Sequence, residues 1–185
     1  MMREAEIKRA LSSHLSLATD SSMLFLEELE LYGGKFRADF VDVAEMHCYE
    51  IKSSGDTLSR LVGQGNSYCR VFDKVTLVTA ECHLKKVIPI LPSWWGVLVI
   101  NETKDKPFKK LRTAKPNNNH EPLYLATLLK KDECISVLEE LGAARGWKSK
   151  SLYLIQEHVA ELLTLAELKT VVRERLKQRL FACVI

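Results

Sequence analysis

Two short segments of alternating apolar and polar residues, 36–43 and 47–53, follow each other closely in this 185-residue chain. Only three residues separate them, so we predict adjacent strands of one sheet joined by a short turn. Side chains alternate between the two faces of a strand. Glu50 and Lys52 should therefore share one face, while Tyr49 and Ile51 turn toward the core. The carboxylates of Asp39 and Glu50 should converge.

A helix is predicted directly after these strands. Ser54-Gly55-Asp56 turns the chain, and a helical pattern runs from about 57 to 72. Arg60, Gln64 and Tyr68 recur at intervals of four, which places them on one helix face.

The flanking segments complete an α/β order. A helix is predicted over 3–17 and a strand over 24–31, followed by a hairpin turn at 32–35. Further on, a buried strand is predicted over 74–80, a helix over 81–91 and another buried strand over 97–101. This succession predicts an α/β fold with a mixed central sheet flanked by helices.

The acids and the lysine on the two strands suggest a particular chemistry. Two carboxylates and an ammonium at neighbouring strand ends can hold a hard divalent cation and a polarised water. Taken singly, Asp39 could be an ordinary exposed carboxylate, and Glu50 with Lys52 a surface ion pair of little energetic value. It is their order and spacing, with Gln64 and Tyr68 behind them, that favours a site.

The succession Asp39, Glu50-Ile51-Lys52 and Gln64-x-x-x-Tyr68 resembles the PD-(D/E)XK nuclease superfamily, in its RecB-type branch. Residues 22–99 also resemble a family of small bacterial and phage proteins named after an uncharacterised bacterial reading frame. The resemblance implies a restriction-endonuclease-like core that uses Mg²⁺ or Mn²⁺. It also implies catalytic roles for five residues: Asp39, Glu50, Lys52, Gln64 and Tyr68.

The same resemblance suggests the metal ligands. They would be Asp39, Glu50, the carbonyl of Ile51 and one acid from the upstream strand. Glu27, Glu28 and Glu30 all lie there, and the position just before a leucine selects Glu28. The alternative is that the three glutamates simply form a solvated face.

Positive charge is uneven along the chain. Residues 1–100 hold 11 Lys and Arg against 13 Asp and Glu, whereas residues 101–185 hold 16 against 11. A basic C-terminal part suits a polyanionic partner, and we expect nucleic acid, most simply DNA. The side chains expected to bind it are Arg37, Arg60, Lys104, Lys106, Lys109, Lys110 and Arg112. Each of them could also be an ordinary solvated charge.

Three regions are predicted: a nuclease-like α/β core over 1–103, a basic linker over 104–122 and a helical C-terminal region over 123–185. No apolar run is long enough to span a membrane, and the N-terminus lacks the apolar centre of a signal peptide. Five scattered cysteines without a Cys-x-x-Cys pair fit reduced thiols. We therefore expect a cytoplasmic protein, with oligomerisation possible.

The sequence thus favours a Mg²⁺-dependent deoxyribonuclease. One alternative is a nuclease-fold module that binds nucleic acid or regulates a partner without cutting. Another is an interaction protein whose helical tail docks a partner.

Overall fold

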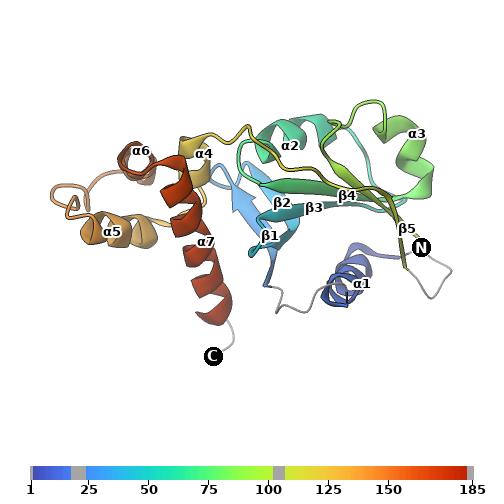
Figure 1. Ribbon diagram of the computed structural model, residues 1–185, viewed down its shortest axis with the longest axis horizontal. Coiled ribbons are helices and arrows are strands. Elements are labelled where there is room, and N and C mark those ends of the chain that lie inside the picture. The colour runs from blue at the N-terminus through green and yellow to red at the C-terminus, as the bar shows by residue number, and fades with distance from the viewer. Residues whose placement is uncertain (1, 18–23, 102–106, 183–185) are drawn as a thin grey trace.

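A six-stranded mixed sheet forms the centre of the protein in the computed structural model, which describes residues 2–17, 24–101 and 107–182 (Figure 1). The strands lie in sequence order: β1 (Phe25–Leu31), β2 (Phe36–Asp42), β3 (His47–Lys52), β4 (Lys74–Ala80), β5 (Gly96–Ile100) and β6 (Phe108–Arg112). The pairs β1/β2, β2/β3 and β5/β6 are antiparallel, whereas β3/β4 and β4/β5 are parallel.

Connection lengths explain this mixture. Short turns at 32–35 and 43–46 can join only antiparallel neighbours, whereas parallel neighbours need a crossover. The first crossover carries α2 (Leu61–Tyr68). The second carries the 3₁₀ helix η1 (Glu81–His83) and α3 (Leu84–Val87). The predicted α/β fold with a mixed sheet flanked by helices is confirmed.

Helices cover both faces of the sheet. Helix α1 (Glu4–Ser16) lies on one face, where Ile7 and Leu11 pack into a core with Phe40, Tyr49 and Ile51. Helix α2 lies on the opposite face, as Figure 1 shows. There Tyr68 stacks on the fully buried Trp95.

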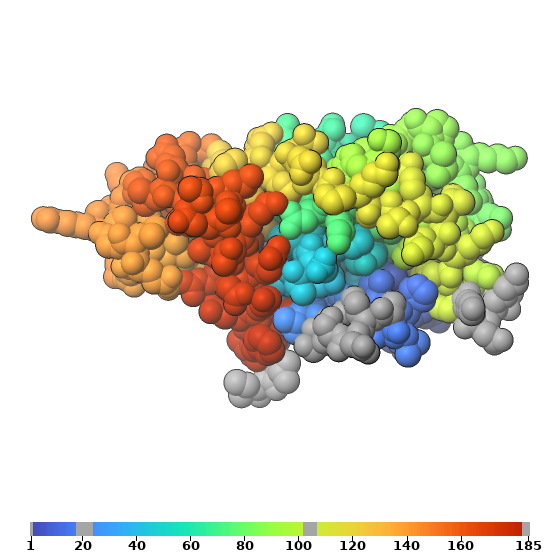
Figure 2. Space-filling model, viewed as in Figure 1, coloured from blue at the N-terminus to red at the C-terminus, as the bar shows by residue number. Residues whose placement is uncertain are grey.

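Four helices form the C-terminal region: α4 (Pro122–Ala126), α5 (Lys131–Glu140), α6 (Leu152–Leu162) and α7 (Leu165–Ala182). Figure 2 shows α5, α6 and α7, in orange and red, making up one end of the molecule. Their buried side chains join the main core of the sheet. The predicted helical tail is confirmed, and 122–182 contains no strand. In the part of the chain that the structure describes, no helix is both long and apolar enough to cross a membrane.

The basic segment after β5 departs from the prediction. Residues 108–112 lie inside the predicted linker but form β6, an edge strand paired with β5. Phe108 is buried in the core beneath α1, whereas Lys109 and Lys110 are exposed. Lysines are tolerated on an edge strand because its free side faces water. Because of these lysines the segment has the composition of a solvated loop, so the sequence analysis predicted a linker and not a strand.

Two predicted helices are shorter than expected. Helix α2 spans Leu61–Tyr68 instead of 57–72, and it contains Gly63 and Gly65, which have low helix propensity. In the segment 81–91 only short helical turns form. Pro89 lacks the amide hydrogen that a longer helix would require.

Gly96, at the start of β5, provides a test of the packing around the sheet. A Cβ atom there would lie 2.5 Å from Thr76 Oγ1 and 2.9 Å from the Ala114 backbone nitrogen. We expect Gly96→Ala to lower the free energy of unfolding by about 1–3 kcal/mol, because backbone must move. Gly63→Ala is the matched control, since a Cβ there meets nothing within 4 Å. Urea denaturation of both variants checks this, and equal stabilities would contradict it.

Asp73 attaches the last helix to the core. Its carboxylate lies 2.6 Å from Lys169 Nζ, 3.3 Å from Arg173 Nη2 and 2.9 Å from His120 Nε2. Partial burial would raise the pKa of Asp73, but His120 and Lys169 outweigh it and lower the pKa to about 2.

A carboxylate with a lowered pKa stabilises the fold above its unfolded pKa of about 4, and this contribution disappears as the pH falls toward 2. We therefore expect Asp73→Asn to cost about 1–2 kcal/mol at pH 7 after allowance for solvent screening. The difference from wild type should shrink between pH 4 and pH 2. Urea titrations at several pH values measure it, and a constant difference would refute the assignment.

Candidate functional site

Strands β2 and β3 separate at one end, and side chains fill the opening. Their pairing ends at Phe40 and Tyr49. Beyond that point the Ile51 amide does not pair with the backbone of β2. It donates a hydrogen bond to the Asp39 carboxylate instead, at 2.8 Å. The site is therefore built where a sheet would ordinarily continue.

Tyr68 reaches this opening from α2. Its hydroxyl lies 2.6 Å from Glu50 Oε2 and 3.0 Å from the Arg37 carbonyl oxygen, so its single proton is shared between two acceptors. Burial raises the pKa of Tyr68 and keeps it protonated. Gln64, one turn earlier, donates weakly to the same hydroxyl at 3.5 Å. The helix thus ties the two strands together where their ladder ends.

Glu50 and Lys52 form a buried pair. Lys52 Nζ lies 2.6 Å from Glu50 Oε1, and the Glu50 side chain is fully buried. Burial by itself lowers the pKa of Lys52, but the neighbouring Glu50 charge and hydrogen bond outweigh it and raise the pKa. Lys52 is therefore an ammonium and supplies positive charge, not a base.

A cleft of about 670 Å³ opens beside this pair. Four basic residues and two acidic ones line it: Lys35, Arg37, Lys52, Arg60, Glu30 and Asp39. Gln64 also lines it, and its Oε1 is buried without a hydrogen-bond partner. The cleft combines cationic side chains with an acidic centre.

Three carboxylates, from Glu4, Glu28 and Asp39, meet at the junction of α1, β1 and β2. We call them the acidic cluster; one oxygen of each lies within 4.8 Å of the others. The β1/β2 register places Glu28 opposite Asp39, although the ladder skips this pair. Like charges in that position repel each other. Glu28 also has a φ of 54°, a backbone conformation that a non-glycine residue adopts at some energetic cost.

The negative charge of Asp39 is disfavoured mainly by burial and by the nearby Glu50, with a smaller contribution from Glu4. These effects raise the pKa of Asp39 to about 7. Hard carboxylate oxygens are the ligands that Mg²⁺ and Mn²⁺ prefer. Glu4, Glu28 and Asp39 are therefore the residues that could hold a divalent ion, and in this structure Glu28 Oε1 and Oε2 contact Lys8 and Arg37 instead.

The predicted ligand set is only partly assembled. Asp39 and Glu28 come together as expected. Glu50 instead bonds to Lys52 and Tyr68, and it is not in the acidic cluster. Ile51 contributes its amide hydrogen to Asp39, and the role of its carbonyl stays a prediction.

Two residues of α1 were missed by the sequence analysis: Glu4 and Lys8. Lys8 is only 6% exposed, and its Nζ contacts Glu4 at 2.9 Å and also contacts Glu28. The one available signal was a Glu-x-x-x-Lys pair adjoining the apolar stripe of the helix, a spacing that is common on solvated helices.

The residues predicted to bind nucleic acid fall into separate groups. Arg37 and Arg60 line the cleft, and Arg37 Nε lies 2.6 Å from Glu28 Oε2. Arg112 donates to the carbonyl oxygens of Trp95 at 2.5 Å and Pro92 at 3.1 Å, which gives it a structural role. Lys109 and Lys110 lie on β6, three strands away from β3, and Lys104 and Lys106 lie outside the described residues.

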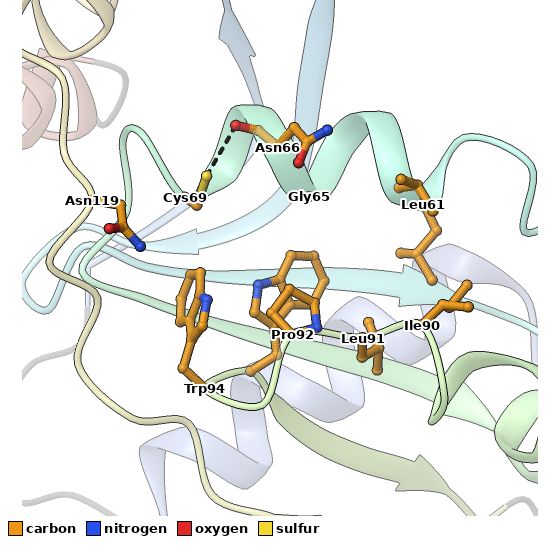
Figure 3. Close-up of a pocket in the computed structure, with 11 residues that line it drawn as sticks. Leu61, Gly65, Asn66, Cys69, Ile90, Leu91, Pro92, Trp94 and Asn119 are labelled. Carbon is orange, nitrogen blue, oxygen red and sulfur yellow. Dashed lines mark hydrogen bonds between the residues drawn. The ribbon is translucent and has the colours of Figure 1, made fainter.

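A second, apolar pocket lies on another side of α2. Figure 3 shows Leu61, Gly65 and Cys69 of the α2 segment above it and Ile90, Pro92 and Trp94 below. Trp95 also lines it, and its Nε1 is buried without a partner. This pocket and the cleft use different faces of one short helix.

Replacing Asp39 provides a test of the strained charge. An acid whose pKa is raised on folding costs stability as the pH rises from its unfolded value of about 4 through 7. Asp39→Asn keeps an oxygen for the Ile51 amide hydrogen but carries no charge. We expect it to be more stable than wild type by about 1–3 kcal/mol at pH 8 and nearly equal at pH 4.

Urea denaturation between pH 4 and pH 8 measures this effect. The exposed Asp132→Asn serves as a control and should follow the wild-type curve. A destabilised Asp39→Asn at pH 8 would show that the carboxylate is not under electrostatic stress.

Comparison with known proteins places the chain in a family. A solved structure of a protein of unknown function from Silicibacter pomeroyi aligns with 78% of this chain and 90% of its own, at 16% identity and a TM-score of 0.40. No curated protein matches significantly. The family model described as bacteriophage P4 protein cII matches residues 1–182. The chain belongs to this phage protein family.

Proposed function

We propose that this protein is a metal-dependent nuclease that hydrolyses phosphodiester bonds in DNA, with a site of the PD-(D/E)XK type. One observation carries the proposal. The cleft surrounds an electrostatically strained carboxylate, Asp39, with Lys35, Arg37, Lys52 and Arg60. Such a site offers an anionic centre for a cation and a cationic rim for phosphate.

The basic side chains that line the cleft would bind and orient the nucleic-acid backbone. Arg60 is exposed at the N-terminal end of α2, and Lys35 lies in the β1–β2 turn region of the same cleft. Guanidinium groups suit phosphate because they donate in a planar fork. Positioning of this kind accounts for much of phosphoryl-transfer catalysis.

The divalent ion would be held by Glu4, Glu28 and Asp39. When bound, it supplies a water of lowered pKa and polarises the scissile phosphate.

Lys52 would stabilise negative charge that develops on the phosphate, since it is already protonated. Glu50 fixes the position of the Lys52 ammonium, and Tyr68 fixes Glu50 in turn. Gln64 has a free buried acceptor that faces the same cleft and can orient a donor there. These four residues form a chain of contacts that leads from α2 to the cleft.

One observation favours the alternative of a non-cleaving nucleic-acid-binding module. Glu50, an expected metal ligand, is fully buried and neutralised by Lys52. A site in which this carboxylate never joins the acidic cluster could grip a phosphate backbone without hydrolysing it. The experiment must therefore separate binding from cleavage.

Labelled duplex, branched and single-stranded oligonucleotides should be incubated with Mg²⁺, Mn²⁺ or EDTA. We expect cleavage with the metals and none with EDTA. Asp39→Asn should lose about 10²–10³-fold in rate while remaining folded. Binding measured with Ca²⁺ in place of Mg²⁺ should survive this substitution. Wild-type cleavage by Asp39→Asn would refute the site, and binding without any cleavage would establish the alternative.

The role of Lys52 must be tested by replacing Lys52 and Glu50 together. Lys52→Ala would leave Glu50 buried and uncompensated, at a cost of about 3–5 kcal/mol, so loss of activity alone would be ambiguous. The double variant Lys52→Met with Glu50→Gln removes both charges together. It should fold, as circular dichroism can show, and still fail to cleave.

The proposed contact between Arg60 and phosphate can be tested separately. Arg60→Ala should weaken DNA binding and reduce the slope of log affinity against log salt by about 1. Lys85→Ala, on α3 outside the cleft, is the matched control and should leave both unchanged. Equal salt slopes for Arg60→Ala and wild type would remove Arg60 from the interface.

A further inference from the structure

The apolar pocket beside α2 exposes apolar side chains to water. Val62 of α2 is 57% exposed, and Ile90, in the segment that faces α2 across the pocket, is 51% exposed. The space has a volume of about 180 Å³. A cavity of about 150 Å³ accommodates a benzene ring, so this pocket has room for one small, flat ring.

Trp94 forms one wall of the pocket. Figure 3 shows its ring reaching from the segment before β5 toward Cys69 and Asn119. The side chain is half-buried and makes a T-shaped contact with the fully buried Trp95, with ring centroids 6.1 Å apart. Arg112 holds this segment by donating to the Trp95 carbonyl oxygen. The Trp94 ring is therefore fixed in place while part of it remains accessible.

Two amide side chains add polar groups to these apolar walls. Asn66 and Asn119 both line the pocket, and both are exposed. An amide offers donors and an acceptor, as the edge of a nucleobase does. Proteins bind unpaired bases by stacking them on aromatic rings and by hydrogen bonding to their edges. A base would match both parts of the pocket, whereas an apolar side chain of a protein partner would match the walls alone.

The pocket adjoins the cleft proposed to bind phosphate. Arg60 lines the cleft, and the next two residues, Leu61 and Val62, line the pocket. Only the width of α2, roughly 10–12 Å with its side chains, separates the two. A few nucleotides of one strand can cover this distance, with phosphates at the basic cleft and a base in the pocket. Bases of an intact duplex are paired and stacked, so they cannot enter unless they are flipped out.

We propose that the apolar pocket binds one unpaired base of a nucleic-acid strand whose phosphates lie in the cleft, and that this base stacks on Trp94. The inference rests on the proposed binding of nucleic acid and specifies its substrate class as single-stranded or locally unpaired. It applies equally to a protein that cleaves the strand and to one that only holds it.

The test measures binding of labelled single strands to the full chain, with Ca²⁺ in place of Mg²⁺. One probe is an oligothymidine of about eight nucleotides. The other has the same length, with abasic sugars in place of the nucleosides. Wild type should bind oligothymidine about 10–100-fold more tightly than the abasic strand, which is the range that stacking of one base provides.

Substitutions assign this difference to the pocket. Trp94→Ala should bind oligothymidine about 10–100-fold more weakly and the abasic strand as wild type does. Trp94→Phe retains a ring and should recover most of the affinity. Tyr153→Ala, which removes a 55% exposed aromatic side chain on α6, is the matched control and should leave both affinities unchanged. Circular dichroism reports that each variant is folded.

Alkylation of cysteines locates the base without any variant. Cys69 lines the pocket, whereas Cys82 is exposed on η1 outside it. Bound oligothymidine should slow the alkylation of Cys69 in wild type and leave that of Cys82 unchanged, as peptide mapping by mass spectrometry can show.

The outcomes distinguish two failures. Equal affinities of wild type for the two strands, with Cys69 unprotected, would overturn this inference and leave nucleic-acid binding at the cleft intact. Oligothymidine binding that folded Trp94→Ala does not weaken would also overturn it, and would leave the pocket to an apolar side chain of a protein partner. Wild type binding neither strand would overturn the proposed function together with this inference.

Discussion

The end of the ladder between β2 and β3 is the feature on which the rest of the site depends. Continued pairing would place backbone where Asp39 and the Tyr68 hydroxyl now lie. Asp39 takes over the Ile51 amide hydrogen, and Tyr68 bridges Glu50 and the Arg37 carbonyl. Side chains thus satisfy polar backbone groups that strands ordinarily satisfy, which leaves room for a cleft within the sheet.

Most of the fold follows from local pattern. Alternation in 36–43 and 47–53 located two strands, and the apolar runs 74–80 and 97–101 located two more. Strict alternation does not hold along the whole of β2, because Ala38 packs in the same core as Val41 and not with Phe40. The irregular pairing around Glu28 and Asp39 accompanies this change, and a period-two pattern cannot reveal it. Strand β6 was missed because its lysines resemble those of a solvated loop.

The site shows where sequence reasoning stops. The motif brought Asp39, Lys52, Gln64 and Tyr68 to one region, because strand order and helix period fix their places. It could not show that Glu50 would prefer Lys52 and Tyr68 to the acidic cluster. Nor could it bring in Glu4 and Lys8, since their approach depends on how α1 docks beneath the sheet. Long-range packing, which leaves no local pattern, decides that part.

The edge strand β6 has a consequence for association between molecules. An unpaired strand edge is a template for another chain, and exposed lysines discourage such pairing. Lys109 and Lys110 are exposed there, and the Arg112 side chain is bound to the loop before β5. Sheet-to-sheet addition at this edge would bring lysine rows of two molecules face to face. Repulsion between these lysines should therefore oppose β-linked chains at this edge even when many copies of the protein are produced.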